Sequence, residues 1–348
     1  MKIGLFLPNW LGDLVMAGPA VRAVRRRFGT GARIVGILRP NLADVFDGTD
    51  WLDEQWYFDP RDRDERVGTA RLIRRMRRER FDTVVLFSNS LRTALIALFG
   101  GAKRRVGYAR NGRGPLLTDA LPYRGGKHLP SPMVDYYLAL VEAIGCSADD
   151  RTLELHTTPV GDLAAERIWR DLRLRRDGRV VALHTGGAYG AAKRWPVEHA
   201  AALARRIADE LQYEVLVLCG PKERETASQI GAAAARPQVR TLAGQPLSLA
   251  AVKSCLARCR LFVGTDSGPR HVAAALGKPV VTLFGPTSPR WVENPTVKAV
   301  DVVNLLPCAP CAKRTCPEKH HRCMQELSPD TVFEQVAALL RGGAVRAA

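Results

Sequence analysis

A short polar loop in the second half of the sequence has the residue types of an anion-binding site. It spans residues 265–271, Thr-Asp-Ser-Gly-Pro-Arg-His, and separates the apolar run 261–264 from a segment of small residues typical of a buried helix. Ser267 or Gly268 can cap that helix, and Pro269 suits its first turn. Free backbone N–H groups at a helix start attract anions, so the loop is predicted to hold a diphosphate.

The side chains of this loop add hydrogen-bonding and charged groups. Asp266 can accept hydrogen bonds from sugar hydroxyls, whereas Arg270 and His271 can neutralise phosphate oxygens or donate to them. Gly268 lets the backbone approach those oxygens closely. With Arg270 as the phosphate-stabilising cation, the predicted donor-binding residues here are Thr265, Asp266, Ser267, Gly268 and His271. The alternative is a well-capped core helix in which His271 finds its partners inside the protein.

A second loop, residues 184–196, follows the apolar run 179–183 and combines glycines with a lysine. Backbone donors beside a point charge are the logic of phosphate-binding loops, although the Walker pattern is absent, which argues against an ATPase loop. Thr185 and Lys193 are the expected phosphate contacts, and Gly186 is expected to contact the donor. The alternative is a basic surface turn anchored by Trp195.

Two carboxylates follow other predicted strands. Glu223 comes shortly after the apolar run 214–220 and is placed to bind the two hydroxyls of a ribose, or simply to open a helix. Asp13 follows Gly12, which permits a close turn, and opens a predicted helix. A carboxylate in that position stays ionised and can act as a general base, or can serve helix stability alone.

Apolar runs alternate with helical patterns along the chain, which predicts parallel, doubly wound sheets. The expected strands lie at 2–7, 33–38, 83–87, 105–108, 179–187, 214–220, 239–242, 261–264 and 279–285. Since 348 residues exceed one typical core, we expect an α/β protein with two Rossmann-like domains facing across a cleft. The predicted domains are 1–160 and 161–328, followed by a helix in 329–348 that packs back on the first domain. Ligands of such sheets bind beyond the carboxyl ends of the strands.

The charge balance favours anionic partners. Lys and Arg outnumber Asp and Glu by 52 to 35, and residues 61–80 place arginines around apolar positions near helical spacing. This segment is either a solvated helix face or a patch for phosphorylated acceptors or lipid headgroups. Further positive charge, including Lys127, lies on predicted loops of the first domain, where the expected acceptor-binding residues are Gly12, Arg92, Arg105 and Arg110. With no signal peptide and no 18-residue apolar run, we expect a cytoplasmic protein in peripheral contact with the inner membrane.

Four of the eight cysteines crowd into residues 308–323, together with two histidines. The ligands suffice for tetrahedral zinc, but the spacing matches no ordinary zinc finger, and we expect reduced thiols and no bound metal. A basic nucleic-acid-binding protein is the alternative class. It is disfavoured because aromatic residues make up only 7% of the chain and no RNP, KH or helix-turn-helix signature is present. An oxidoreductase is disfavoured by the absence of GxGxxG after the first strand of either domain.

Residues 12–29, 184–196 and 264–287 together resemble the ADP-heptose:lipopolysaccharide heptosyltransferases of glycosyltransferase family 9, especially the heptosyltransferase II type, and the cysteine-rich tail is similar too. The resemblance covers nearly the whole chain. It departs from the family where Thr185-Gly186 replaces the frequent Pro-Gly, and where Ser267-Gly268-Pro269 differs from the heptosyltransferase I type.

The resemblance implies a GT-B fold, an ADP-heptose donor in the second domain, a Kdo–lipid A inner-core acceptor in the first, and inversion at the anomeric carbon. Matched by motif, Asp13 is the base, Lys193 a diphosphate contact and Glu223 the ribose contact. Such a transfer needs a base on one face of the sugar and stabilisation of the leaving diphosphate on the other. Fixed positive groups can take the place of Mg²⁺, so we expect no metal or other cofactor. A glycosyltransferase that uses another nucleotide sugar is the alternative.

Overall fold

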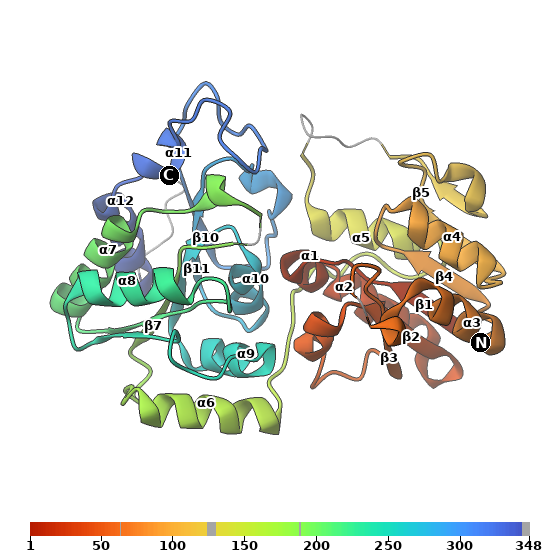
Figure 1. Cartoon of the computed structure of the whole chain (residues 1–348), viewed down its shortest axis with the longest axis horizontal. Helices are drawn as coiled ribbons and strands as arrows, with labels where there is room; N and C mark the ends of the chain where they lie inside the picture. Colours follow the sequence, from red (N-terminus) through yellow and green to blue (C-terminus); the bar gives the residue numbers. More distant parts are fainter. Residues whose placement is uncertain (63, 124–129, 188, 343–348) are drawn as a thin grey trace. The chain divides into compact units, whose positions relative to one another are not determined.

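The computed structural model describes residues 1–62, 64–123, 130–187 and 189–342, and the chain forms two compact units. The first unit comprises Met1–His156 with Val292–Asn294, and the second comprises Thr157–Trp291 with Pro295–Ala348. Each holds a six-stranded sheet flanked by helices (Figure 1). Lys127 lies outside the described residues. Within them, no helix is both long enough and apolar enough to cross a bilayer.

The first sheet is parallel throughout, in the order β3-β2-β1-β4-β5-β6. Its strands are β1 (Lys2–Phe6), β2 (Arg33–Leu38), β3 (Glu54–Tyr57), β4 (Thr83–Leu86), β5 (Arg104–Tyr108) and β6 (Asp119–Leu121). The strand order reverses between β1 and β4. At such a switch point the neighbouring crossovers leave in opposite directions and open a crevice at the carboxyl edge.

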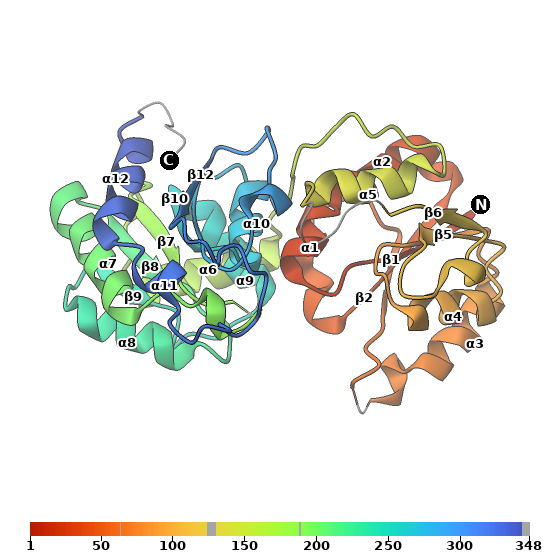
Figure 2. The same ribbon diagram turned by 90° about the horizontal axis from the view of Figure 1, so that it is seen from above.

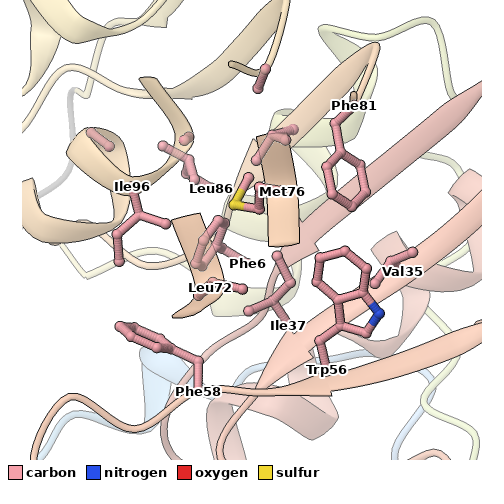
Figure 3. Close-up of a cluster of buried hydrophobic side chains, with 14 of the residues drawn as sticks. Phe6, Val35, Ile37, Trp56, Phe58, Leu72, Met76, Phe81, Leu86 and Ile96 are labelled. Atoms are coloured by element: carbon pink, nitrogen blue, oxygen red, sulfur yellow. The ribbon is translucent and has the colours of Figure 1, made fainter. Parts of the chain in front are cut away.

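Helices cover both faces of the first sheet. They are α1 (Leu11–Met16), α2 (Gly18–Phe28), α3 (Thr69–Glu79), α4 (Leu91–Phe99) and α5 (Met133–Glu142), with 3₁₀ turns at Gly29–Gly31, Pro40–Val45, Glu65–Val67 and Gly114–Leu116. Figure 2 shows α2 and α5 on one face and α3 with α4 on the other. Beneath α3 and α4, Phe6, Ile37, Trp56, Met76 and Phe81 converge in one buried cluster (Figure 3).

The predicted first helix is interrupted once. The pattern that begins near Asp13 predicts one helix through Val24, but the structure ends α1 at Met16 and starts α2 at Gly18. Pro19 has no backbone N–H to donate to the carbonyl four residues earlier, and proline is favoured in a first helical turn, so a new helix begins there.

The second sheet repeats the same topology, in the order β12-β11-β10-β7-β8-β9, and is also parallel. Its strands are β7 (Val180–His184), β8 (Glu214–Val217), β9 (Val239–Thr241), β10 (Leu261–Thr265), β11 (Val280–Phe284) and β12 (Ala299–Val303). Here the order reverses between β7 and β10. The expected α/β class with two Rossmann-like units is confirmed.

The helices of the second unit are α6 (Pro159–Asp171), α7 (Val197–Leu211), α8 (Arg224–Ala234), α9 (Leu249–Arg258), α10 (Gly268–Ala275), α11 (Arg322–Gln325) and α12 (Pro329–Leu340), with 3₁₀ turns at Ala191–Lys193 and Pro289–Trp291. The last helix, α12, packs on α7 of its own unit, and the expected contact with the first domain stays a prediction. Its apolar Val332 and Val336 are fully buried there. Residues 343–348 of the predicted terminal segment are outside the described chain.

Candidate active site

The loops after β7 and β10 meet at the switch point of the second sheet. The two strands pair directly, with Gly264 beside His184. A Cβ built on Gly264 would lie 2.0 Å from the His184 carbonyl oxygen, which no side chain tolerates. The glycine therefore brings the polar residues that follow both strands into one place. This is the position where doubly wound sheets bind ligands.

Lys193 and Asp266 form a buried ion pair across these two loops. The Lys193 ammonium lies 2.6 Å from Asp266 Oδ2 and donates to the Asp266 carbonyl at 2.7 Å, and both side chains are at most one-tenth exposed. Thr287 also donates to Asp266 Oδ2, at 2.9 Å. Burial alone would raise the pKa of Asp266, but His271 and Lys193 hold it well below its usual range. Two predicted donor-site residues are thus brought together, with the carboxylate ionised.

His271 is buried beside this pair and is neutral at pH 7. Burial lowers its pKa to about 4, although Asp266 opposes the shift. Its Nε2 lies 3.7 Å from Asp266 Oδ1, and its Nδ1 lies 3.4 Å from the Arg270 guanidinium. Because Arg270 can only donate, Nδ1 must accept, and the ring proton sits on Nε2 towards the carboxylate.

Arg270 does not take the place that the sequence suggests. Its side chain is 2% exposed, and its Nε donates to Thr282 in β11 at 3.2 Å, with Asp301 supplying negative charge nearby. This geometry does not support the direct phosphate contact that the sequence predicts for Arg270. Arg270 lies two residues after the start of α10, and its side chain points into the interior of the second unit.

Glu223, His184 and Ser267 form a second network that ties three strand ends together. His184 Nε2 lies 3.2 Å from Glu223 Oε2, and His184 Nδ1 lies 3.1 Å from the Ser267 hydroxyl. Burial opposes ionisation of Glu223, but His184 and the Gly220 N–H lower its pKa to about 2. A Cβ on Gly186 would lie 2.0 Å from Glu223 Oε1, so only glycine lets this carboxylate reach the loop after β7.

The start of α10 keeps a backbone donor available. Ser267 is the extended N-cap residue, but its side chain makes no capping hydrogen bond and instead donates to the Thr265 carbonyl at 3.1 Å. Pro269 has no N–H and the Arg270 N–H donates to the Ser267 carbonyl at 3.2 Å, so the Gly268 N–H is the backbone donor that this helix start offers to an anion. Thr265 and Thr185 are both buried, and the Thr265 hydroxyl donates to the Gly186 carbonyl, so these two threonines shape the loops.

In the first unit, Asp13 lies at the carboxyl end of β1, again at the switch point. It is half-buried on α1 and accepts a hydrogen bond from the buried Tyr137 hydroxyl, whose pKa is raised well above its usual value by burial and by this carboxylate. Gly12 is an ordinary helical residue of α1, so the structure does not contain the close turn that the sequence predicts there.

The predicted acceptor-binding arginines occupy two different edges of the first sheet. Arg92 is exposed in the first turn of α4, and Arg110 follows β5, so both lie at the carboxyl edge that also carries Asp13. The Arg110 guanidinium stacks 3.9 Å from the Tyr123 ring centroid. Arg105 instead donates to the carbonyls of Ala102 and Leu116 near the opposite edge. Its acceptor role is not supported by that position.

A family model described as "Glycosyltransferase family 9 (heptosyltransferase)" matches residues 69–322. The chain belongs to glycosyltransferase family 9. It is therefore a glycosyltransferase. Lipopolysaccharide heptosyltransferase 2 of Escherichia coli K12 is 29% identical over 352 residues, covering 98% of this chain and 99% of the relative. Lipooligosaccharide heptosyltransferase 2 of Campylobacter jejuni is 26% identical, with 98% and 99% covered.

Solved structures agree with this assignment. The structure titled E. coli ADP-heptose lps heptosyltransferase II has a TM-score of 0.80 and 27% identity, covering 98% of this chain and 99% of that one. A family 9 glycosyl transferase from Veillonella parvula has a TM-score of 0.82 at 21% identity, with 98% and 97% covered, and supports the fold. The GT-B class expected for a family 9 enzyme is thus confirmed.

Sequence reasoning missed several residues that the structure places at the candidate site or at the carboxyl edge of the first sheet. His184 was read only as the start of a loop, yet it is 3% exposed and holds both Glu223 and Ser267. Thr287 follows the run 279–285, and its place after a strand was the available signal. In the first unit, the fully buried Arg113 donates to the Tyr108 carbonyl and to Asn89 Oδ1, bracing the loop after β4.

The cysteine-rich segment does not form a metal centre in the described chain. All eight cysteines are free thiols. Cys308 Sγ lies 3.9 Å from His320 Nε2, but across residues 1–342, outside the gaps given above, no three His, Cys, Asp or Glu side chains are grouped to hold a metal ion. The segment packs on the loop after β7, where Ala192 donates to the Arg314 carbonyl at 3.2 Å.

Proposed function

We propose that this glycosyltransferase transfers L-glycero-D-manno-heptose from ADP-heptose to the inner core of lipopolysaccharide with inversion, as a heptosyltransferase II. The observation that carries the proposal is the cluster of polar side chains at the β7–β10 switch point, called here the polar cradle. It comprises Lys193, Asp266, His184, Glu223 and Ser267. It lies in a chain similar, over nearly its full length, to proteins named lipopolysaccharide heptosyltransferase 2.

The donor is assigned to the second unit. The Gly268 N–H at the start of α10 binds the diphosphate, and the absence of a side chain at Gly268 permits close approach. Lys193 adds positive charge beside it and is itself oriented by Asp266. The Glu223 carboxylate, kept ionised and fixed by His184, accepts hydrogen bonds from the ribose hydroxyls. These contacts strengthen as the diphosphate gains charge on leaving.

The acceptor is assigned to the first unit, with Asp13 as the base. The acceptor hydroxyl attacks the anomeric carbon as the bond from that carbon to the diphosphate oxygen breaks. Its proton passes to the Asp13 carboxylate, and the bonding pair leaves with ADP. The hydrogen bond from Tyr137 holds Asp13 in place. Arg92 and Arg110, at the same edge, attract the anionic Kdo–lipid A inner core.

Because that acceptor is a lipid, we also propose that the protein works in the cytoplasm in peripheral contact with the inner membrane. It uses no metal or other cofactor and no nucleic acid. A GT-B enzyme for a different nucleotide sugar is the second candidate, since the same cradle fits any nucleoside diphosphate. Donor screening separates the two, with ADP-heptose expected to be turned over fastest.

The deciding experiment offers ADP-heptose with Kdo–lipid A that carries or lacks the first heptose. We expect transfer to the heptose-primed acceptor alone. Asp13→Asn is expected to lower kcat by about 10²–10⁴-fold while ADP affinity stays the same, because only the base is lost. Asp50→Asn, at an exposed carboxylate of the same unit, is the matched control. Equal transfer to both acceptors, or full activity of Asp13→Asn, contradicts the proposal.

A further inference from the structure

Helix α3 presents a stripe of arginines that form no salt bridge among the described residues, although the Asp64 carboxylate, which already pairs with Arg66, lies near Arg71. Arg71, Arg74 and Arg78 recur at the spacing of one helix face and are exposed, while Leu72 and Met76 are buried on the opposite side. None of the three arginines forms a salt bridge with a carboxylate of the described chain. The nearest acidic residue on the helix, Glu79, is already paired with Lys2 and Arg33.

Exposed apolar side chains lie beside this stripe. Arg77 Nε donates to the Phe99 carbonyl at 2.6 Å, so the ends of α3 and α4 are in contact. There Phe99 is 52% exposed and Leu98 is 36% exposed. A Cβ on Gly100 would lie 2.8 Å from Met76 Cβ, which shows how closely the two helices pack. The arginines and the two apolar side chains therefore belong to one rigid surface.

We propose that this surface, formed by Arg71, Arg74, Arg78, Leu98 and Phe99, docks the enzyme on an anionic lipid bilayer. Guanidinium groups pair with lipid phosphates, while a leucine and a phenylalanine enter the boundary between headgroups and acyl chains. The residues of this surface are spread along two helices, so they suit an extended headgroup layer better than a single small anion. This deepens the proposed function, since it names the part of the chain that meets the membrane carrying the acceptor.

The location of the surface leaves the acceptor edge free. Helix α3 follows β3 and precedes β4, so it runs along the sheet from the carboxyl edge to the amino edge. Figure 2 shows α3 and α4 together on one face of the sheet. Asp13 on α1 and Arg110 after β5 lie at the carboxyl edge, and Arg92 lies in the first turn of α4, at the opposite end of that helix from Leu98 and Phe99. Bilayer contact through α3 and α4 therefore does not bury the proposed base.

Helix α6 of the second unit provides a matched contrast. It also exposes apolar side chains, Val160 at 76% and Leu163 at 64%, but its charges are mixed. Glu166 pairs with two arginines, and Arg170 lies 3.6 Å from Asp171. We expect little bilayer affinity from α6, because Asp162, Glu166 and Asp171 on the same helix repel lipid phosphates.

The test is co-sedimentation of the full chain with vesicles of phosphatidylcholine alone or with about one-third phosphatidylglycerol. We expect binding to the anionic vesicles only, decreasing as salt is added. Each arginine near the surface contributes about fivefold, so Arg71→Gln/Arg74→Gln/Arg78→Gln should weaken binding about 100-fold. Phe99→Ser should weaken it about tenfold at constant charge. Arg167→Gln/Arg170→Gln/Arg173→Gln removes equal charge around α6 and should change binding less than threefold.

Unchanged ADP affinity and circular dichroism show that each variant is folded, and neither readout requires turnover. Wild-type binding by the α3 variant, equal binding to neutral vesicles, or an equal loss in the α6 variant each overturns the docking surface. The docking surface is also overturned if the α3 variant loses affinity for single-stranded RNA while it keeps its binding to vesicles. Failure of heptose transfer with intact bilayer binding would count against the proposed function alone.

Discussion

At the scale of single residues, the donor loops hold charge where water is largely excluded. Asp266 stays ionised because Lys193, Thr287 and His271 surround its two oxygens. Removing one partner of such a pair leaves a buried charge, which costs several kcal/mol. His271 faces Asp266, Arg270 and Lys193, and is kept neutral by its burial. The two groups therefore respond to pH in different ranges.

His271 should make the stability of the protein depend on pH between about 6.5 and 4. In that range the unfolded chain binds a proton that the folded ring, with its pKa lowered to about 4, does not bind. Stability is therefore full above the unfolded pKa and is lost as the pH falls, by up to about 3 kcal/mol. Urea unfolding followed at several pH values measures this slope.

His271→Gln should flatten that slope, because glutamine keeps a donor for Asp266 and does not titrate. His156→Gln is the control, since His156 is exposed beside Glu154. The assignment to His271 is refuted if the exposed control flattens the slope as much. The Asp266 carboxylate does not interfere, because its lowered pKa moves its own effect to more acidic solution.

Sequence reasoning selected most of the polar residues that the structure brings together after β7, β8 and β10, but it does not give the direction of each side chain. Lys193, Asp266 and Glu223 were selected because they follow predicted strands, and the sheet order brings those strand ends together. Arg270 lies in the same loop, but its side chain turns towards Thr282. Residue type and spacing do not give the direction of this side chain, because the direction depends on Thr282 in the neighbouring strand β11.

At the scale of elements, the buried strands were predictable, whereas of the four edge strands in the two described sheets only β9 was. The runs that form β1, β4, β7 and β10 are apolar on both faces, as expected for the interior of a parallel sheet. The edge strands β3, β6 and β12 contain Glu, Gln or Asp and were not predicted. Each is short or half-exposed, so hydrophobic periodicity gives little signal there.

Gly264 is the point where two elements are drawn together most closely. Gly264→Ala should push β10 away from β7, because the new methyl group would meet the His184 carbonyl at 2.0 Å. We expect a loss of about 3 kcal/mol in stability and at least tenfold weaker ADP binding. Gly244→Ala is the matched control, since nothing lies within 4 Å of a Cβ there. Thermal unfolding and calorimetric titration with ADP test both variants, and equal behaviour would contradict this account of the switch point.

At the scale of the whole molecule, the same topology is used twice with different polar loops. Both sheets have the 3-2-1-4-5-6 order within their unit. In the first unit, Asp13 on α1 follows β1. In the second unit, the Lys193–Asp266 ion pair and the backbone donor at the start of α10 follow β7 and β10. The doubling was visible in the sequence as a repeated alternation of strands and helices. The limits of the units were less visible, because Val292–Asn294 joins the first unit from far along the chain.

This division predicts where a nucleotide protects the chain. With ADP present, hydrogen exchange should slow in residues 184–193, 219–224 and 264–271, and should not change in residues 10–16. The backbone donor at the start of α10 and the Lys193 ammonium, which together bind the diphosphate in this proposal, both belong to the second unit. The protein itself therefore supplies the positive charge that a metal ion would otherwise provide. Adding EDTA should therefore leave both the protection and the rate of transfer unchanged. Protection confined to residues 10–16, or its disappearance with EDTA, would mean that the phosphate is bound elsewhere or through a metal ion.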